Sequence, residues 1–200
     1  MKLFKIVLLA IFSSIFTQCS GYDTQNAIHD SQLSDSERFA LEYPLVGSDN
    51  IFVFRNASET ADILANGRGI VFKGFKECPW CQLYVVFLHD VAREMGVDRI
   101  YYLDIREDRQ ANSESYQRIL SLLSGRLQYD EQGHPRVYVP DVSIVSRGRI
   151  ILRDFVSLEE AFEYCTPEEY WNEKRVNALK ERLRAGIHIL NQLNRPCDIC

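Results

Sequence analysis

Residues 69–95 read GIVFKGFKECPWCQLYVVFLHDVAREM, and the pattern changes from strand to helix at the two cysteines. Residues 69–73 are rich in β-branched and aromatic side chains, which are favoured in strands. After Cys78, apolar side chains recur at intervals of four and three residues, which indicates a helix with one buried face. That stripe consists of Cys81, Val85, Leu88, Ala92 and Met95. The sequence therefore predicts a strand that leads into the amino end of a long helix, with Cys78 at the junction.

This junction has the chemistry of a reactive thiol. Cys78 precedes the helix, where unpaired backbone N–H groups and the positive end of the helix dipole stabilise a thiolate. Pro79 suits the first helical turn because that position needs no backbone N–H. We therefore expect Cys78 to be the attacking thiol and Cys81, one turn later on the buried stripe, to be the resolving thiol. Lys76 and Glu77 carry opposite charges, so the sequence does not give the sign of their combined effect on Cys78.

Strand and helix patterns alternate on both sides of the junction, and Arg147-Gly148 has the composition of a hairpin turn. The expected strands are 51–54, 69–73, 99–104, 142–146 and 149–153, and 127–136 is expected to be a polar loop. The expected helices are 36–42, 57–66, 79–95, 113–124, a short one after Ser157, and a last one over 167–193. Helices between strands indicate parallel pairing by right-handed crossovers, and the hairpin adds an antiparallel edge. The pattern predicts an α/β fold with a mixed sheet.

A strand, a C-x-x-C at a helix start, and a later X-Pro ahead of a hairpin together resemble the thioredoxin superfamily, over about residues 51–161. The resemblance implies a thioredoxin-like three-layer α/β/α sandwich with a mixed sheet and an added C-terminal helix. It implies that Pro140 is the cis-proline beside the disulfide and that Val139 offers its backbone to an extended substrate. It assigns catalysis to Cys78 and Cys81 and substrate binding to Pro79, Trp80, Val139 and Pro140.

Three features of the sequence can be compared with the thioredoxin and glutaredoxin subfamilies. Pro79-Trp80 is closer to the Pro-Tyr of glutaredoxins than to the Gly-Pro of thioredoxins. Thioredoxins carry a buried Asp six residues before the first cysteine, where this chain has Phe72, so the proton-acceptor role is unfilled there. The Gly-Gly-Asp glutathione-binding segment of glutaredoxins does not follow Asp141. The motif therefore indicates the superfamily and leaves the subfamily open.

The first residues have the pattern of an export signal. Lys2 and Lys5 precede an apolar run of about eleven residues, whereas a membrane-spanning helix needs about 20. Residues 16–19, Phe-Thr-Gln-Cys, resemble a bacterial lipobox, which implies lipidation of Cys19. The alternative is ordinary cleavage after Gly21, which would discard Cys19 and secrete the protein. The expected location is extracytoplasmic, with a lipid anchor in the cell membrane.

Composition and spacing suggest four segments in the 200 residues. These are a signal peptide (1–18), a lipid-anchored polar tether with a short helix (19–50), the thioredoxin-like domain (51–165), and a C-terminal helix with a C-x-x-C tail (166–200). A hydrophobic content of 46% fits one globular core. A net charge of −5 without a basic cluster argues against a nucleic-acid partner.

The other cysteines and several aromatic and imidazole side chains leave alternatives open. Cys197 and Cys200 are expected to form a second, local disulfide, with Cys165 a free thiol; the alternative is a dithiol tail that exchanges with Cys78–Cys81. An unbroken last helix of about 40 Å would keep Cys165 away from that tail, and a break near Gly186 would change this. His89 and His188 are expected to be packing or solvated residues, and His134 is a conceivable substrate contact. Tyr170 and Trp171 are expected to dock the last helix.

The resemblance and the export signal together predict an extracytoplasmic thiol–disulfide oxidoreductase, similar to the membrane-tethered enzymes of bacteria. Its partners would be exported proteins with thiols or disulfides and a membrane or extracytoplasmic redox protein, and it would need neither cofactor nor metal. One alternative is a non-catalytic thioredoxin-fold accessory for secretion of another exported protein, such as a bacteriocin. Another is a zinc-binding protein that uses both C-x-x-C pairs.

Overall fold

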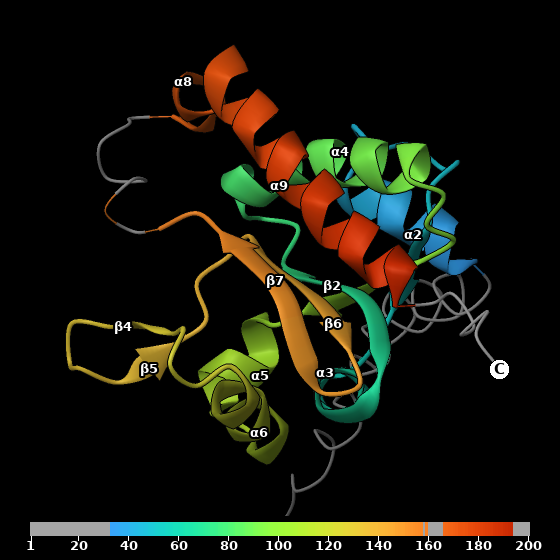
Figure 1. Ribbon diagram of the computed structural model, residues 1–200. Coiled ribbons are helices and arrows are strands. Elements are labelled where there is room, and N and C mark those ends of the chain that lie inside the picture. The colour runs from blue at the N-terminus through green and yellow to red at the C-terminus, as the bar shows by residue number, and fades with distance from the viewer. Residues whose placement is uncertain (1–32, 158, 160–165, 194–200) are drawn as a thin grey trace, which may run out of the picture. The chain divides into compact units, whose positions relative to one another are not determined.

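Five strands form one mixed sheet in the computed structural model, which describes residues 33–157, 159 and 166–193 (Figure 1). The strand order is β1-β3-β2-β6-β7, with β2 parallel to β3, β3 parallel to β1, and β6 antiparallel to both β2 and β7. The strands are β1 (Phe52–Phe54), β2 (Arg68–Gly74), β3 (Ile100–Asp104), β6 (Asp141–Ser146) and β7 (Arg149–Phe155). The predicted parallel pairing and antiparallel hairpin are both confirmed.

Helices cover both faces of this sheet (Figure 1). One face, which we call the α4 face, carries α2 (Asp35–Glu42), α4 (Pro79–Glu94) and α9 (Glu173–Gln192), with the short α8 (Pro167–Tyr170) beside them. The other face, which we call the α6 face, carries α3 (Ala57–Asn66) and α6 (Glu114–Leu122), with α5 (Arg106–Ala111) next to α6. The described chain is therefore an α/β/α sandwich with an added C-terminal helix, compatible with a thioredoxin-like sandwich as predicted.

Local sequence explains where several helices start. Capping boxes, in which a polar side chain and a glutamate three residues later bond each other's backbone N–H groups, begin α2, α3 and α8. Cys78 precedes α4 and Pro79 is its first residue. The predicted stripe of α4 is buried at Cys81, Val85, Leu88 and Ala92, while Met95 follows the helix end and is partly buried. These helix starts were predictable because residues close together in the chain specify each of them.

The two faces differ in their apolar side chains. The core of the α4 face is rich in aromatic rings, and Phe39 of α2 stacks on Phe52 with ring centroids 3.8 Å apart. The core of the α6 face is mostly aliphatic. Phe39 and Tyr43 are fully enclosed, so the short helix expected within the tether is packed into the core of the α4 face.

The structure corrects the sequence prediction in four respects. Residues 127–136 contain two paired two-residue strands, β4 (Gln128–Tyr129) and β5 (Pro135–Arg136), and α5 was not predicted. The last helix is divided, because Asn172 caps a new helix by accepting the Arg175 backbone N–H. It continues through Gly186 without a break, and Leu193, assigned to its apolar side, is half exposed.

Gly186 has a packing role. A Cβ at this position would lie 2.7 Å from Ile144 Cδ1 and 3.0 Å from Leu152 Cδ2. The absence of a side chain therefore lets α9 approach β6 and β7 closely.

Several predictions fall outside the described residues. These are the signal segment, Cys19, the short helix expected after Ser157, Cys165, Cys197 and Cys200. Within the described ranges, no helix has the length and apolarity that a bilayer crossing requires.

Candidate active site

Cys78 and Cys81 form a disulfide at the amino end of α4, with their Cα atoms 5.2 Å apart. The Cys81 backbone N–H donates to Cys78 Sγ at 3.1 Å, so Cys78 caps the helix with its sulfur. The Cys78 N–H in turn donates to the Phe75 carbonyl at 3.1 Å. Cys78 keeps 5% of its surface exposed and Cys81 none. Of the two cysteines, Cys78 is therefore the one with some surface open to solvent.

The chain returns to this disulfide from the far side of the fold. The Val139–Pro140 peptide bond is cis, and the Val139 carbonyl oxygen lies 3.9 Å from Cys78 Sγ. The structure thus brings together Cys78, Cys81, Val139 and Pro140 from segments about sixty residues apart. That Val139 and Pro140 bind substrate stays a prediction.

Trp80, between the two cysteines, has a fixed neighbour in α8. Its ring centroid lies 5.1 Å from that of Tyr170 in an edge-to-face arrangement. Trp171 packs on Tyr84 and Phe87 of α4, with centroids 5.7 and 5.6 Å away. The expected docking role of Tyr170 and Trp171 is confirmed, and it has a consequence for the site: α8 orients the tryptophan of the C-x-x-C motif.

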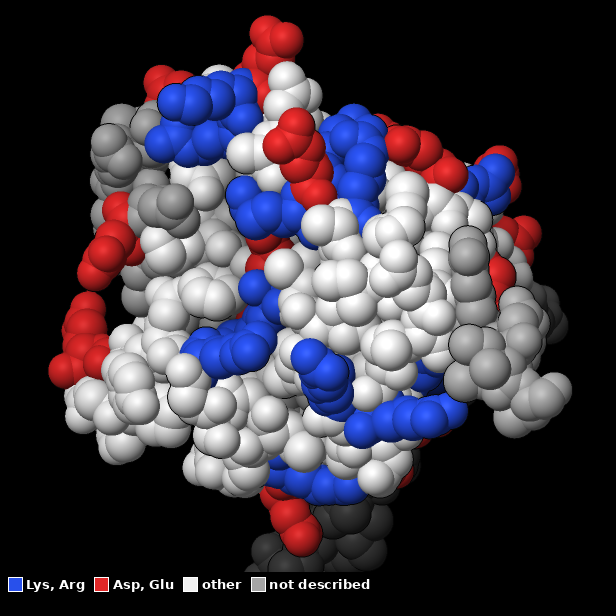
Figure 2. All heavy atoms as spheres, in the orientation of Figure 1, with Lys and Arg blue, Asp and Glu red and all other residues white. Residues whose placement is uncertain are grey.

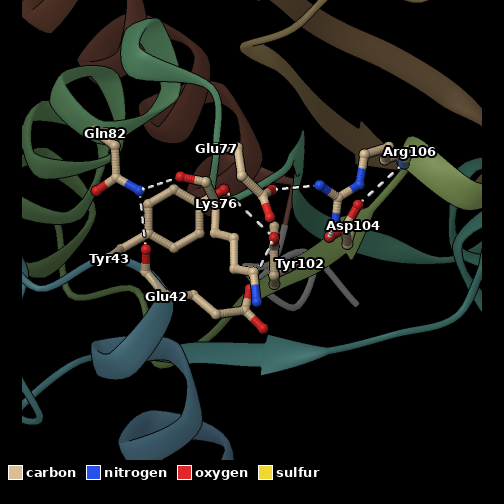
Figure 3. A network of polar contacts seen from close by, with 8 residues as sticks. All are labelled: Glu42, Tyr43, Lys76, Glu77, Gln82, Tyr102, Asp104 and Arg106. Atoms are coloured by element: carbon tan, nitrogen blue, oxygen red, sulfur yellow. Dashed lines mark hydrogen bonds and ion pairs between the residues drawn. The ribbon is translucent and has the colours of Figure 1, made fainter.

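The charge of Glu77, beside Cys78, is compensated by Arg106 (Figure 3). Arg106 Nη1 lies 2.5 Å from Glu77 Oε2, and Arg106 also lies 3.8 Å from Asp104. The hydrogen bond from Arg106 lowers the pKa of the Glu77 carboxyl. The sequence did not give the combined effect of Lys76 and Glu77 on Cys78. Because Glu77 is paired with Arg106, it opposes a Cys78 thiolate less than an unpaired carboxylate would.

The end of α2 braces the loop that carries Cys78. Gln82 Nε2 donates to the Glu42 carbonyl at 2.8 Å and to the Lys76 carbonyl at 2.7 Å (Figure 3). Below it, the Tyr102 hydroxyl donates to Glu42 Oε2 at 3.1 Å and accepts from the Tyr43 hydroxyl at 3.3 Å. Burial raises the pKa of Glu42 and of both tyrosines. Sequence reasoning missed this brace, because a glutamine in a helix gives no signal of its partners.

A buried ionic cluster lies next to Pro140. Lys73 Nζ on β2 is 2.6 Å from Asp141 Oδ1 on β6 and donates to Ser143 Oγ at 3.0 Å. Arg153 on β7 donates to Asp141 Oδ2 through Nε at 2.7 Å. Lys73 and Asp141 are fully enclosed, and Arg153 is 3% exposed. Burial lowers the pKa of the Lys73 ammonium, and the nearby Asp141 carboxylate acts in the opposite direction.

A second buried carboxylate, Asp154, follows Arg153 on β7. Asp154 accepts from the Tyr84 hydroxyl at 3.1 Å and from Arg182 Nε at 2.6 Å, which links β7 to α4 and α9. Burial raises the pKa of the Tyr84 hydroxyl, so it remains a neutral donor. Neither carboxylate was predicted; the available signal was a charged residue at the end of, or next to, each of three predicted strands, namely Lys73, Asp141 and Asp154.

The histidines lie elsewhere. His134, between β4 and β5, pairs with Asp130 at 3.6 Å and has a largely exposed side chain. His89 stacks on Phe52 at 6.0 Å, and burial lowers its pKa. Within the described residues, no group of three or more His, Cys, Asp or Glu side chains is arranged to hold a metal ion.

Comparison of the chain with known proteins gave no match among protein-family models, curated proteins or solved structures. Function is therefore inferred from the geometry around Cys78.

Proposed function

We propose that this protein is an extracytoplasmic thiol–disulfide oxidoreductase that exchanges disulfides with exported proteins through Cys78 and Cys81. One observation carries the proposal: the disulfide lies at the amino end of α4, with the outer sulfur capping the helix and facing the Val139 carbonyl. The Cys81 N–H that donates to Cys78 Sγ would also stabilise this sulfur as a thiolate, together with the positive end of the helix dipole.

The exchange balances as a two-electron transfer between the cysteine pair and a substrate disulfide. In the reduced protein, the Cys78 thiolate attacks one substrate sulfur, so the substrate S–S bond breaks and the first substrate thiolate leaves and takes up a proton. Cys81 then loses its proton and attacks Cys78 Sγ, which releases the second substrate thiol and re-forms the Cys78–Cys81 disulfide. The substrate disulfide is reduced and the protein oxidised; the reverse sequence oxidises a substrate dithiol.

The surroundings of Cys78 suit a protein substrate. The backbone at Val139 would pair with an extended segment, and Pro79 and Trp80 would contact the residues next to the substrate sulfur. Tyr170 fixes the Trp80 ring, so this contact surface is preformed. The proposal includes no cofactor.

The proposed location follows from the amino-terminal sequence. Export by residues 1–18 and lipidation of Cys19 would place the enzyme at the outer side of the cell membrane, and cleavage after Gly21 would secrete it instead. Its redox partner would then be a membrane or extracytoplasmic protein. Metabolic labelling with a radioactive fatty acid would distinguish the two, because only the lipoprotein incorporates label and Cys19→Ser abolishes it.

The decisive experiment measures thiol reactivity and reduction potential. Cys78 of the reduced protein should react with iodoacetamide at a lower pH than a free cysteine, whose pKa is about 8.5. Equilibration with glutathione buffers gives the potential; a value near about −270 mV favours a reductase and one near about −120 mV an oxidase.

Matched variants then assign the roles. Cys78→Ser should abolish insulin reduction, and Cys81→Ser should accumulate a mixed disulfide with substrate. If Cys78 is no more acidic than a free thiol and neither insulin nor oxidised peptides are exchanged, the proposed function is wrong.

A further inference from the structure

β7 forms the outer edge of the sheet and borders a groove that the sequence did not predict. Two hollows follow one another along this strand, one of about 530 Å³ beside residues 148–151 and one of about 310 Å³ beside residues 152–155. Residues of α9 line both hollows, from Arg175 to Ile189, and Leu193, which follows the helix, also lines the first. We call these two hollows together the β7–α9 groove.

Arginines line this groove although the chain as a whole carries a net charge of −5. They are Arg126 and Arg149 in the first hollow and Arg153, Arg175 and Arg182 in the second. Among the described lining residues, Asp154 is the single carboxylate. Figure 2 looks onto this face, where blue side chains cross the surface over β7 with few red ones between them, while red side chains stand among the blue ones at the upper end of α9.

The carboxylates that pair with Arg153 and Arg182 do not neutralise the first hollow. Asp141 pairs with both Arg153 and Lys73, and all three side chains are at most 3% exposed, so this cluster adds little to the surface charge of the groove. Asp154 balances Arg182. Arg126 and Arg149 are both exposed at the surface of the first hollow. A ligand therefore meets a basic groove.

The groove also offers apolar contacts and an open strand edge. Ile189 and Leu193 are 45% and 50% exposed, and Ile150 and Ile151 are half-buried beside them. In the described part of the chain, no strand pairs with the outer edge of β7. An open edge provides backbone hydrogen bonds to an added extended segment.

We propose that the β7–α9 groove binds an extended acidic segment of a partner protein. The seven residues of β7 span about 23 Å, so a segment of similar length would reach from the arginines of one hollow to those of the other. Apolar side chains at alternate positions would contact Ile189 and Leu193. A protein segment fits better than a membrane or a nucleic acid, because the arginines line a hollow with isoleucine and leucine and an open strand edge. This proposal does not depend on thiol chemistry.

Synthetic peptides test the proposal. Fluorescein-labelled Glu-Val-Glu-Val-Glu-Val-Glu should bind the wild-type protein at least about tenfold more tightly than the same peptide with Gln for Glu, a difference of about 1.4 kcal/mol. Its binding should weaken as salt is raised. The double variant R126E/R149E should lose binding at least about tenfold. The matched control is R118E, on α6, where the exposed Arg118 pairs with Asp62 outside the groove; it should bind as the wild type does.

Three outcomes would overturn the proposal. The first is equal binding of the Glu and Gln peptides, or no binding of either. The second is binding of phosphatidylglycerol vesicles or a single-stranded oligonucleotide, but not of the acidic peptide, lost in R126E/R149E; the ligand would then be a phosphate surface. The third is peptide binding that occurs only after deletion of residues 194–200, which would make the chain's own C-terminal segment the occupant.

Discussion

Among the described residues, each face of the sheet buries one carboxylate, and the two carboxylates are neutralised differently. On the α6 face, Asp141 lies among Lys73 and Arg153, and all three side chains are at most 3% exposed. On the α4 face, Asp154 is 6% exposed, but its cationic partner Arg182 is 51% exposed. Successive residues of a strand point to opposite faces, which is why Arg153 and Asp154, adjacent in β7, join different networks.

The difference concerns access to water. If Asp141 is removed, two cations remain enclosed, whereas Arg182 can turn to solvent if Asp154 loses its charge. An uncompensated enclosed charge costs far more than an exposed one. The enclosed cluster around Asp141 adjoins Pro140. The network around Asp154, whose Arg182 reaches solvent, includes Tyr84 on the helix that carries the disulfide. We therefore expect the α6 face to be more sensitive to single substitutions.

The largest effect is expected for Asp141→Asn. The substitution leaves Lys73 and Arg153 buried without a carboxylate, so the free energy of unfolding should fall by about 3–5 kcal/mol in urea titrations. Asp62→Asn is the control, because its exposed pair with Arg118 should contribute less than about 1 kcal/mol. Equal effects of the two substitutions would show that Asp141 is not enclosed as described.

Gly186→Ala tests the contact of α9 with the sheet. The new Cβ would press on Ile144 and Leu152, and overpacking of this kind costs about 1–3 kcal/mol. The better helix propensity of alanine, worth about 1 kcal/mol, would offset part of it. Asn177→Ala, at an exposed position of α9, is the control and should not destabilise the protein. A Gly186→Ala protein more stable than the wild type would contradict the close packing.

Tyr84→Phe measures the hydrogen bond to Asp154. Removing the hydroxyl deletes one donor to this carboxylate while Arg182 remains, so the expected loss is about 1.5–2 kcal/mol by thermal or urea unfolding. The double variant Tyr84→Phe/Arg182→Gln should lose more than the sum of the two single changes, because Asp154 then has neither partner. Additive losses would mean that the two donors act independently.

The smallest effect is expected at the brace beside Cys78, and it depends on pH. Burial raises the pKa of Glu42, so its contribution to stability is present below the ordinary glutamate pKa and is lost as pH rises through the raised value. Glu42→Gln should therefore raise Tm slightly at pH 7 and leave it unchanged near pH 3.5.

The opposite sign is expected for Glu77. Arg106 lowers the pKa of Glu77, whose contribution to stability is present above the ordinary glutamate pKa and is lost as pH falls. Glu77→Gln should therefore lower Tm at pH 7. If the two substitutions shift Tm in the same direction at pH 7, one of the two assignments is wrong.

Local features of the fold were predictable from the sequence. The capping box at Asn56, the position of Cys78 before a proline-started helix, and the hairpin at Arg147-Gly148 all depend on residues within a few positions of each other. The site pair Cys78–Cys81 was predictable for the same reason. The short β4 and β5 were missed because strands of two residues have no measurable periodicity.

What the sequence by itself determined is the order of the elements, the α/β class and the placement of a cysteine pair at a helix start, because backbone geometry and capping act over three or four residues. Only the tertiary structure decided that Lys73 meets Asp141, that α2 braces the Cys78 loop through Gln82, and that arginines from distant segments line one groove. These contacts join segments more than 20 positions apart along the chain. The tertiary fold sets the distances between these residues and their burial, and burial determines the electrostatic free energy of each charge.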